Sequence, residues 1–293
     1  MKDLYYAILM FASMLFWGLA WINAKVLSNY LDSYNLIFWR FLIASVSLLP
    51  VAWFMGLKFK ISLKTLLLSF ITAILMLMYN YAFFEGTKYG NAGFGGVLVT
   101  TLNPILTFFV IAILAKKNLT KKEYLALFLG AVGSLIMLEI WKFGIDIWFK
   151  DGIKYFLMAA ILWVFVTVAS SKNSEVSSII YSFYVYIFMI IIDYVFVLNF
   201  SVKIESFDYI FWLNLFAVSL LAVTFATTVY FLATTKRGSK YASAFIFLVP
   251  FSAAIFAYIF LGEKLKLTTI IGGVTVMAAI YILQGFEWHK RNK

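Results

Sequence analysis

The chain has 293 residues, of which 64% are hydrophobic and only 13% are charged, and its formal net charge is +11. An ordinary soluble domain is about a quarter charged, so this composition excludes one and indicates an integral membrane protein. With no cysteine, and with its single histidine in the C-terminal tail, the sequence excludes thiol chemistry and a histidine-based site, and we expect no metal, no cofactor and no enzymatic activity.

Apolar runs of about 20 residues, the length that crosses the hydrocarbon core as a helix, follow one another along nearly the whole chain. The first run follows Lys2 as in a signal peptide, but it is long and lacks a clear cleavage site, so we interpret it as a retained helix. The runs predict ten membrane spans, at about 4–24, 35–55, 65–84, 93–114, 124–140, 154–171, 178–199, 209–234, 241–261 and 267–286.

Basic residues concentrate in alternate loops. If the N-terminus is cytoplasmic, 15 Lys and Arg residues fall on the inner side of the membrane and 7 on the outer side. Cytoplasmic loops carry an excess of Lys and Arg, so this bias predicts a multi-pass protein of the cell inner membrane with both termini in the cytoplasm. The same rule accounts for the net charge, and we expect no nucleic-acid partner.

The two halves share landmark residues at a single offset. Trp17 and Trp163, Pro104 and Pro250, and Leu119 and Leu265 are each 146 positions apart. Five spans per half is an odd number, so the second copy enters the membrane from the opposite side and forms an inverted repeat. Chance matches between two apolar halves are the alternative. We expect a first repeat at 1–141, a periplasmic connecting loop at 142–152, and a second repeat with a short cytoplasmic tail at 153–293.

Four segments carry a resemblance to a known family: LFWGLAWINAK at 15–25, FWRFLIAS at 38–45, LNPILTFFVIAILAKKNLT at 102–120 and VPFSAAIFAYIFLGEKLKL at 249–267. Together they resemble the drug/metabolite transporter superfamily, and within it the ten-helix EamA-type transporters. The resemblance implies two five-helix repeats around a central cavity and a secondary transporter that exports a small compound by alternating access. The first repeat departs from the pattern at Lys116 and Lys117, where the family usually has Gly-Glu.

Ionisable residues at membrane depth are candidates for function, because burying a charge in hydrocarbon is costly. Arg40 could bind a substrate carboxylate as a bidentate fork; alternatively it reaches the outer headgroups or pairs with Asp193 as a structural bridge. Asp193 and Glu85 are candidates for coupling transport to a proton gradient; for Asp193 the alternative is an interfacial position or neutralisation by Arg40. Lys25, at a helix end, is expected to extend to the headgroups.

Aromatic residues mark one face of the first helix. Trp17 and Trp21 lie one helical turn apart, and Trp163 occupies the matching place in the second half. Their rings could stack on a planar or cationic substrate. Ordinary helix packing is the alternative.

Polar side chains deep within the spans could line a central cavity with hydrogen-bonding groups. Alternatively, hydroxyl groups bond their own helix and asparagines join helices together, while the glycines of spans four and ten allow close helix packing. These substrate-binding candidates are Tyr79, Asn80, Asn103, Thr227 and Tyr230.

Pro104 and Pro250 each free a backbone carbonyl about one turn earlier, so we expect hinges at both positions. In an inverted repeat, one kinked pair of helices can open toward one side of the membrane while the other closes, which is the simplest form of alternating access.

The sequence thus predicts an all-α integral membrane protein of ten helices, arranged as two inverted repeats around a central cavity. The predicted function is transport of a small metabolite or drug-like compound, with an amino acid or an aromatic or cationic molecule favoured. The predicted partners are this substrate, the bilayer and a coupling proton, and the protein is expected to be a monomer or homodimer. A membrane-embedded lipid-processing enzyme and a channel without alternating access are the alternatives.

Overall fold

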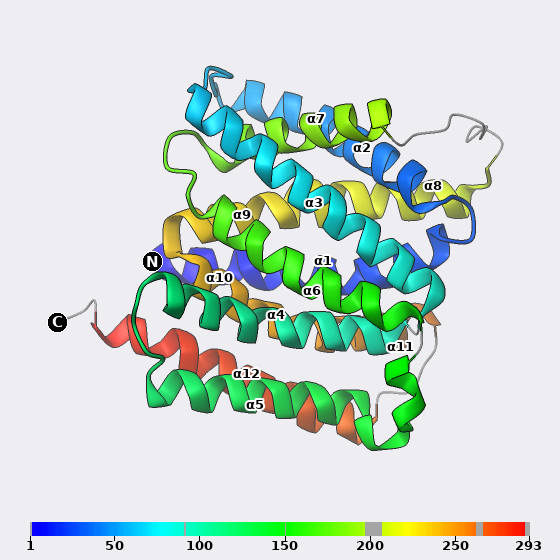
Figure 1. Ribbon diagram of the computed structural model, residues 1–293, viewed down its shortest axis with the longest axis vertical. Helices are drawn as coiled ribbons and strands as arrows, with labels where there is room; N and C mark the ends of the chain where they lie inside the picture. Colours follow the sequence, from blue (N-terminus) through cyan, green and yellow to red (C-terminus); the bar gives the residue numbers. More distant parts are fainter. Residues whose placement is uncertain (1, 91, 150, 197–206, 262–265, 291–293) are drawn as a thin grey trace.

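The computed structural model describes residues 2–90, 92–149, 151–196, 207–261 and 266–290, and in these ranges it contains helices and no strands. Figure 1 shows the helices running side by side across the molecule, with both chain termini at the same edge. The main helices are α1 (Lys2–Leu27), α2 (Ser33–Phe54), α3 (Leu63–Tyr89), α4 (Ala92–Leu114), α5 (Lys121–Leu138), α6 (Asp151–Ser170), α7 (Ser178–Phe196), α8 (Tyr209–Phe216), α9 (Thr228–Arg237), α10 (Ser239–Ala244), α11 (Val249–Leu261) and α12 (Leu267–Lys290).

Local sequence signals set where several helices begin. The Asp32 carboxylate accepts the backbone N–H groups of Tyr34 and Asn35 at the start of α2, each at 3.0 Å. At the start of α5, Thr120 and Glu123 form a reciprocal capping box. Asp208 caps α8 by accepting the N–H of Phe211 at 3.0 Å. These caps satisfy the backbone donors that the first turn of a helix leaves unpaired.

Two predicted spans are not regular α-helices along their whole length. The span at 209–234 corresponds to α8, an 11-residue π-helix, η4 (Ala217–Thr227), and α9. The span at 241–261 corresponds to α10, a 3-10 turn, η5 (Phe245–Leu248), and α11. The 3-10 turn η5 ends two residues before Pro250, which is the second residue of α11, whereas Pro104 lies inside the α-helix α4.

Equivalent helices of the two halves occupy equivalent places. The first half ends in α5, and the connection to α6 contains two short 3-10 helices, η1 (Ile140–Lys142) and η2 (Ile145–Phe149). Helix α2 packs against α7, and α5 packs against α12. These two pairs lie at opposite ends of the long axis in Figure 1, with the remaining helices between them.

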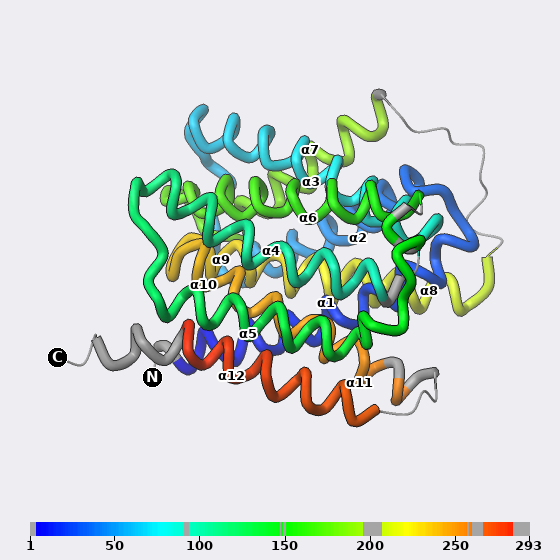
Figure 2. The backbone as a smooth tube through the Cα atoms, turned by 60° about the horizontal axis from the view of Figure 1, so that its bottom comes forward, coloured from blue at the N-terminus to red at the C-terminus, as the bar shows by residue number. Residues whose placement is uncertain are grey.

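The first helix of each half is inserted into the other half. Helix α6 packs against α3 and α4, while α1 packs in the same way against η4 and α11. The tube view of Figure 2 agrees, because α1 and α11 lie together there and α6 lies between α3 and α4. The expected inverted repeat is therefore present as an exchange of first helices around a shared centre.

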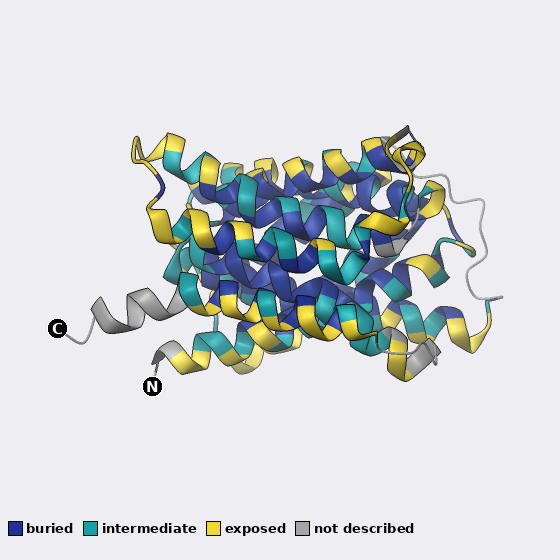
Figure 3. Cartoon of the chain, turned by 90° about the horizontal axis from the view of Figure 1, so that it is seen from below, coloured by how far each residue is buried: buried dark blue, intermediate teal, exposed yellow. Residues whose placement is uncertain are grey.

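The outer surface is apolar, as a bilayer requires. Large apolar side chains such as Trp53, Phe54 and Tyr281 are more than two-thirds exposed, and Figure 3 shows buried residues concentrated in the interior. Eight described helical segments are long and apolar enough to cross a membrane, and residues 267–283 form a shorter apolar helix. The predicted all-α membrane fold is confirmed, and the chain is a multi-pass integral membrane protein.

Candidate functional site

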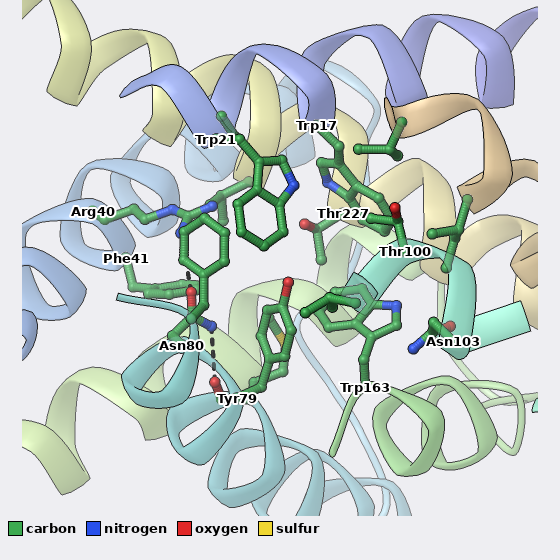
Figure 4. A pocket seen from close by; sticks show the side chains of 17 residues that line it. Trp17, Trp21, Arg40, Phe41, Tyr79, Asn80, Thr100, Asn103, Trp163 and Thr227 are labelled. Carbon is green, nitrogen blue, oxygen red and sulfur yellow. Dashed lines mark hydrogen bonds between the residues drawn. The ribbon is translucent and has the colours of Figure 1, made fainter. Parts of the chain in front are cut away.

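A cavity of about 50 Å³ lies at the centre of the molecule, where α1, α2, α3, α4, α6, η4, η5 and α11 converge. Both halves contribute to its wall, and Figure 4 shows the side chains around it. The lining residues are Trp17, Ala20, Trp21, Arg40, Phe41, Met76, Tyr79, Asn80, Phe83, Val99, Thr100, Asn103, Trp163, Val223, Thr227, Ile246 and Val249.

Aromatic rings form much of the wall. Trp17 and Trp163 pack edge to face with 5.1 Å between ring centroids, and Tyr79 lies 4.5 Å from Trp163. Trp21 packs against Phe83 at 4.6 Å. The indole N–H of Trp17 donates to the carbonyl of Ala222 in η4 at 3.1 Å, so it links the first half to the second.

A charged group forms one pole of the cavity. Arg40 is only 7% exposed, and its Nη1 donates to Asn80 Oδ1 at 3.0 Å. The Asn80 side chain is held in turn, because its Nδ2 donates to the carbonyl of Met76 at 2.8 Å. The guanidinium also lies 5.7 Å from the ring centroid of Phe41 and 5.8 Å from that of Phe84. Figure 4 shows this Arg40–Asn80 pair on the opposite side of the aromatic rings from Asn103.

Uncharged polar groups form the other pole. Asn103 Nδ2 donates to the carbonyl of Ala160 in α6 at 3.3 Å, while no described residue donates to its buried Oδ1. Thr100 and Thr227 donate to carbonyls of their own helices, at 2.6 Å to Gly96 and 2.9 Å to Ala222. Their hydroxyl oxygens keep lone pairs that can accept a further hydrogen bond.

The structure thus brings most of the expected substrate-binding residues to one cavity. Tyr230 is the exception, because it is fully buried behind the wall, 5.0 Å from Trp17 and 5.6 Å from Trp163. Its hydroxyl shares a hydrogen bond of 2.7 Å with Thr167. A role for these residues in binding stays a prediction.

The two coupling candidates lie outside the cavity wall. Asp193, in α7, is fully buried, and neither carboxylate oxygen has a hydrogen-bond partner among the described residues. Glu85, near the end of α3, accepts a hydrogen bond of 2.5 Å from Ser33.

The alternative that Arg40 pairs with Asp193 or reaches the headgroups is wrong, since Arg40 is buried against Asn80. Lys25 donates to the carbonyl of Thr87 at 3.1 Å.

Sequence reasoning missed several parts of the site. Phe41, Met76, Phe83 and Val223 line the cavity, but apolar side chains in an apolar chain carry no signal that separates a cavity wall from a lipid-facing surface. The spacing of Phe83, four residues after Tyr79, could have identified it as a neighbour on the same helix face. The π-helix η4 has no sequence signature comparable to that of a capped α-helix.

Ion pairs outside the cavity tie α5 to the second half at both ends. Near its first turn, Glu123 pairs with Lys240 of α10 at 2.5 Å. Just beyond its last turn, Glu139 pairs with Lys142 at 2.8 Å and with Lys266 at 2.7 Å. Hydrogen bonds from Lys142 and then Lys266 lower the pKa of Glu139 to about 2.

Comparisons with known proteins agree with this architecture. A sequence model described as the EamA-like transporter family matches the chain twice, over residues 4–139 and 150–284. An uncharacterized transporter from Archaeoglobus fulgidus is 28% identical over 290 residues, covering 94% of this chain and 96% of that protein.

A second relative, the uncharacterized transporter YyaM from Bacillus subtilis, is 33% identical over 141 residues, covering 47% of this chain and 46% of that protein. One solved structure, described only as a crystal structure of a protein, superposes with a TM-score of 0.74 at 15% identity, covering 95% of this chain and 96% of that one. That likeness concerns the fold alone.

Proposed function

This chain belongs to the EamA-like transporter family, and within that family of membrane transporters we propose that it is a secondary transporter exporting a small metabolite or drug-like compound by alternating access. The observation that carries the proposal is the central cavity, which both halves line with aromatic rings and polar groups. A site at the interface of inverted repeats can be exposed to either side of the membrane when the two halves rock against each other.

The size of the cavity supports a cycle with more than one conformation. A volume of about 50 Å³ has room for no more than a few water molecules. Sites for small molecules usually enclose roughly 300–1,000 Å³. We therefore expect the helices around Trp17 and Trp163 to separate when a substrate enters, which is the movement that alternating access requires.

The proposed membrane orientation follows from the charges. With both termini at one face and basic residues concentrated on that face, we place the protein in the cell inner membrane with its termini in the cytoplasm. Asp193 is proposed to couple export to the proton gradient, because a buried carboxyl group without a hydrogen-bond partner in the described ranges is suited to reversible protonation. Glu85 is the second candidate.

Reconstitution into liposomes tests the proposal. Aromatic amino acids and aromatic carboxylates serve as the first probes, and uptake is measured with and without unlabelled compound trapped inside. A carrier gives saturable uptake that the trapped compound accelerates, and Trp163→Ala should abolish it, whereas the lipid-facing variant Tyr281→Ala should not. Flux that rises linearly without saturation would identify a channel, and chemical conversion of the probe would identify an enzyme.

A further inference from the structure

Arg40 is a buried cation without a carboxylate partner. Within the described part of the chain, its single hydrogen bond goes to the neutral amide of Asn80, and its Nε has no partner. A charge removed from water is normally compensated by an opposite charge in contact with it. Among the described residues, no acidic side chain fills that role for Arg40.

The acidic residues that could have compensated Arg40 are used elsewhere or do not contact it. Glu85 accepts from Ser33, and Asp32 caps α2 through the N–H groups of Tyr34 and Asn35. Asp193 has no hydrogen-bond donor among the residues that the structure describes. The salt bridges of the described chain are all formed by lysines outside the cavity.

The guanidinium is nevertheless held in a defined position. Asn80 fixes Nη1, and the Met76 carbonyl fixes Asn80. The rings of Phe41 and Phe84 flank the planar group. A guanidinium carries five N–H donors in a rigid fork that matches the two oxygens of a carboxylate. One edge of the Arg40 fork is therefore oriented by the protein and free of hydrogen bonds.

The rest of the wall limits the charge and shape of what can bind. Arg40 is the one charged side chain among the lining residues, so the cavity offers one positive charge and no negative charge. Trp17, Tyr79 and Trp163 present ring faces and edges beside it. A bound cation would be repelled by Arg40, and the lining residues include no anionic group to offset that repulsion. A dianion would carry two negative charges, of which Arg40 could neutralise one.

We propose that Arg40 is the anion-binding residue of this site and that the substrate is an organic monocarboxylate with a planar body. The carboxylate binds the free edge of the Arg40 fork, and the planar body lies against the indole and phenol rings of the cavity. This inference rests on the proposed transport function, and it removes cationic compounds from the range of substrates that the sequence favours.

Three probes of one shape test the charge preference: 3-phenylpropanoate, its neutral amide and phenethylammonium. Binding to the purified protein in detergent is measured as a rise in melting temperature, since a ligand of the folded state raises it. The carboxylate is expected to stabilise the protein, and the amide and the ammonium compound are not. Equal stabilisation by the amide or the ammonium compound, or no response to any probe, would overturn the inference.

Variants of Arg40 test its role. Arg40→Lys should weaken carboxylate binding by about tenfold or more, because a lysine cannot form the bidentate fork, and Arg40→Gln should abolish the preference for the carboxylate. Arg237→Gln, which removes an arginine outside the cavity, should bind as the unmodified protein does. An unchanged response of Arg40→Gln to the carboxylate would rule Arg40 out.

The melting temperature without ligand separates a binding role from a structural one. If Arg40 is an uncompensated charge, Arg40→Gln should melt at or above the temperature of the unmodified protein, whereas removal of a structural ion should lower it. Counterflow in liposomes tests transport independently. Carboxylate binding without counterflow would contradict the proposed function alone, and counterflow of the ammonium compound alone would contradict this inference.

Discussion

Trp17 and Trp163, which occupy equivalent positions in the two halves, meet edge to face at the centre of the protein with 5.1 Å between their ring centroids. The axis that relates the halves therefore passes between these two indoles. Their hydrogen bonding differs, however. Trp17 donates to the carbonyl of Ala222 at 3.1 Å, whereas the indole N–H of Trp163 lies near the hydroxyl of Tyr230 without reaching the geometry of a full hydrogen bond.

The two tryptophans form a matched pair for measuring this difference. Trp17→Phe and Trp163→Phe remove the same atoms, but only the first removes a hydrogen bond of good geometry. We expect Trp17→Phe to be the less stable variant by about 0.5–1.5 kcal/mol, the net contribution of one such bond. Unfolding in detergent micelles by denaturant titration measures the difference. Equal stability of the two variants would mean that the Trp17 bond contributes nothing.

Gly95 provides a test of helix packing. A Cβ atom at this position would lie 2.1 Å from the buried ring of Phe156, so Gly95→Ala should cost roughly 1–3 kcal/mol of stability through overpacking. Gly96→Ala is the control, because its Cβ would come no closer than 3.3 Å to Trp21. Adding Phe156→Leu to Gly95→Ala should restore part of the loss, and failure to do so would place the strain elsewhere.

Asp193 provides a test of coupling. If it carries the coupling proton, Asp193→Asn should abolish accumulation driven by a pH gradient and leave counterflow unchanged, because exchange of substrate for substrate moves no net protons. Asp151→Asn, at an exposed pair with Lys154, should alter neither measurement. Accumulation at the normal level in Asp193→Asn would exclude Asp193 from the mechanism, and the same pair of measurements on Glu85→Gln tests the second candidate.

Glu139 should make the stability of the folded protein depend on pH in the acidic range. Its pKa is lowered to about 2 by Lys142 and Lys266, whereas the pKa of an unperturbed glutamate is about 4.3. The stabilisation of the folded protein by Glu139 is therefore complete above the unperturbed pKa, and it is lost as the pH falls toward the lowered pKa of the folded state. We expect Glu139→Gln to melt below the unmodified protein at about pH 6, with the difference shrinking toward about pH 3. A difference that does not depend on pH would contradict this assignment.

Much of the fold could be predicted from the sequence, because the length of each apolar run matches the thickness of the bilayer. The structure places helix ends within a few residues of the predicted spans, at capping residues such as Asp32, Thr120 and Asp208. The π-helix η4 could not be predicted, since the shift of backbone hydrogen bonds that creates it has no signature in the local sequence.

The sequence could identify residues of the cavity wall only where a polar or charged side chain interrupts an apolar run. Arg40, Asn80 and Asn103 stand out because hydrocarbon offers such groups no partners. Periodicity shows which residues share a helix face but not which neighbouring helix that face meets. For this reason the sequence could not place Asp193 away from Arg40, or Tyr230 behind the tryptophans rather than beside the cavity.

The exchange of first helices has a consequence for biosynthesis. Helix α1 is translated first, yet its principal partners, η4 and α11, belong to the last third of the chain. Helix α6, by contrast, emerges when α3 and α4 are already available. The nascent protein must therefore keep α1 in the bilayer without its native neighbours until translation is nearly complete. A chain divided between α5 and α6 would yield two fragments. The first would lack α6, which packs against its α3 and α4, and the second would lack α1, which packs against its η4 and α11, so each fragment would hold the helix that the other needs.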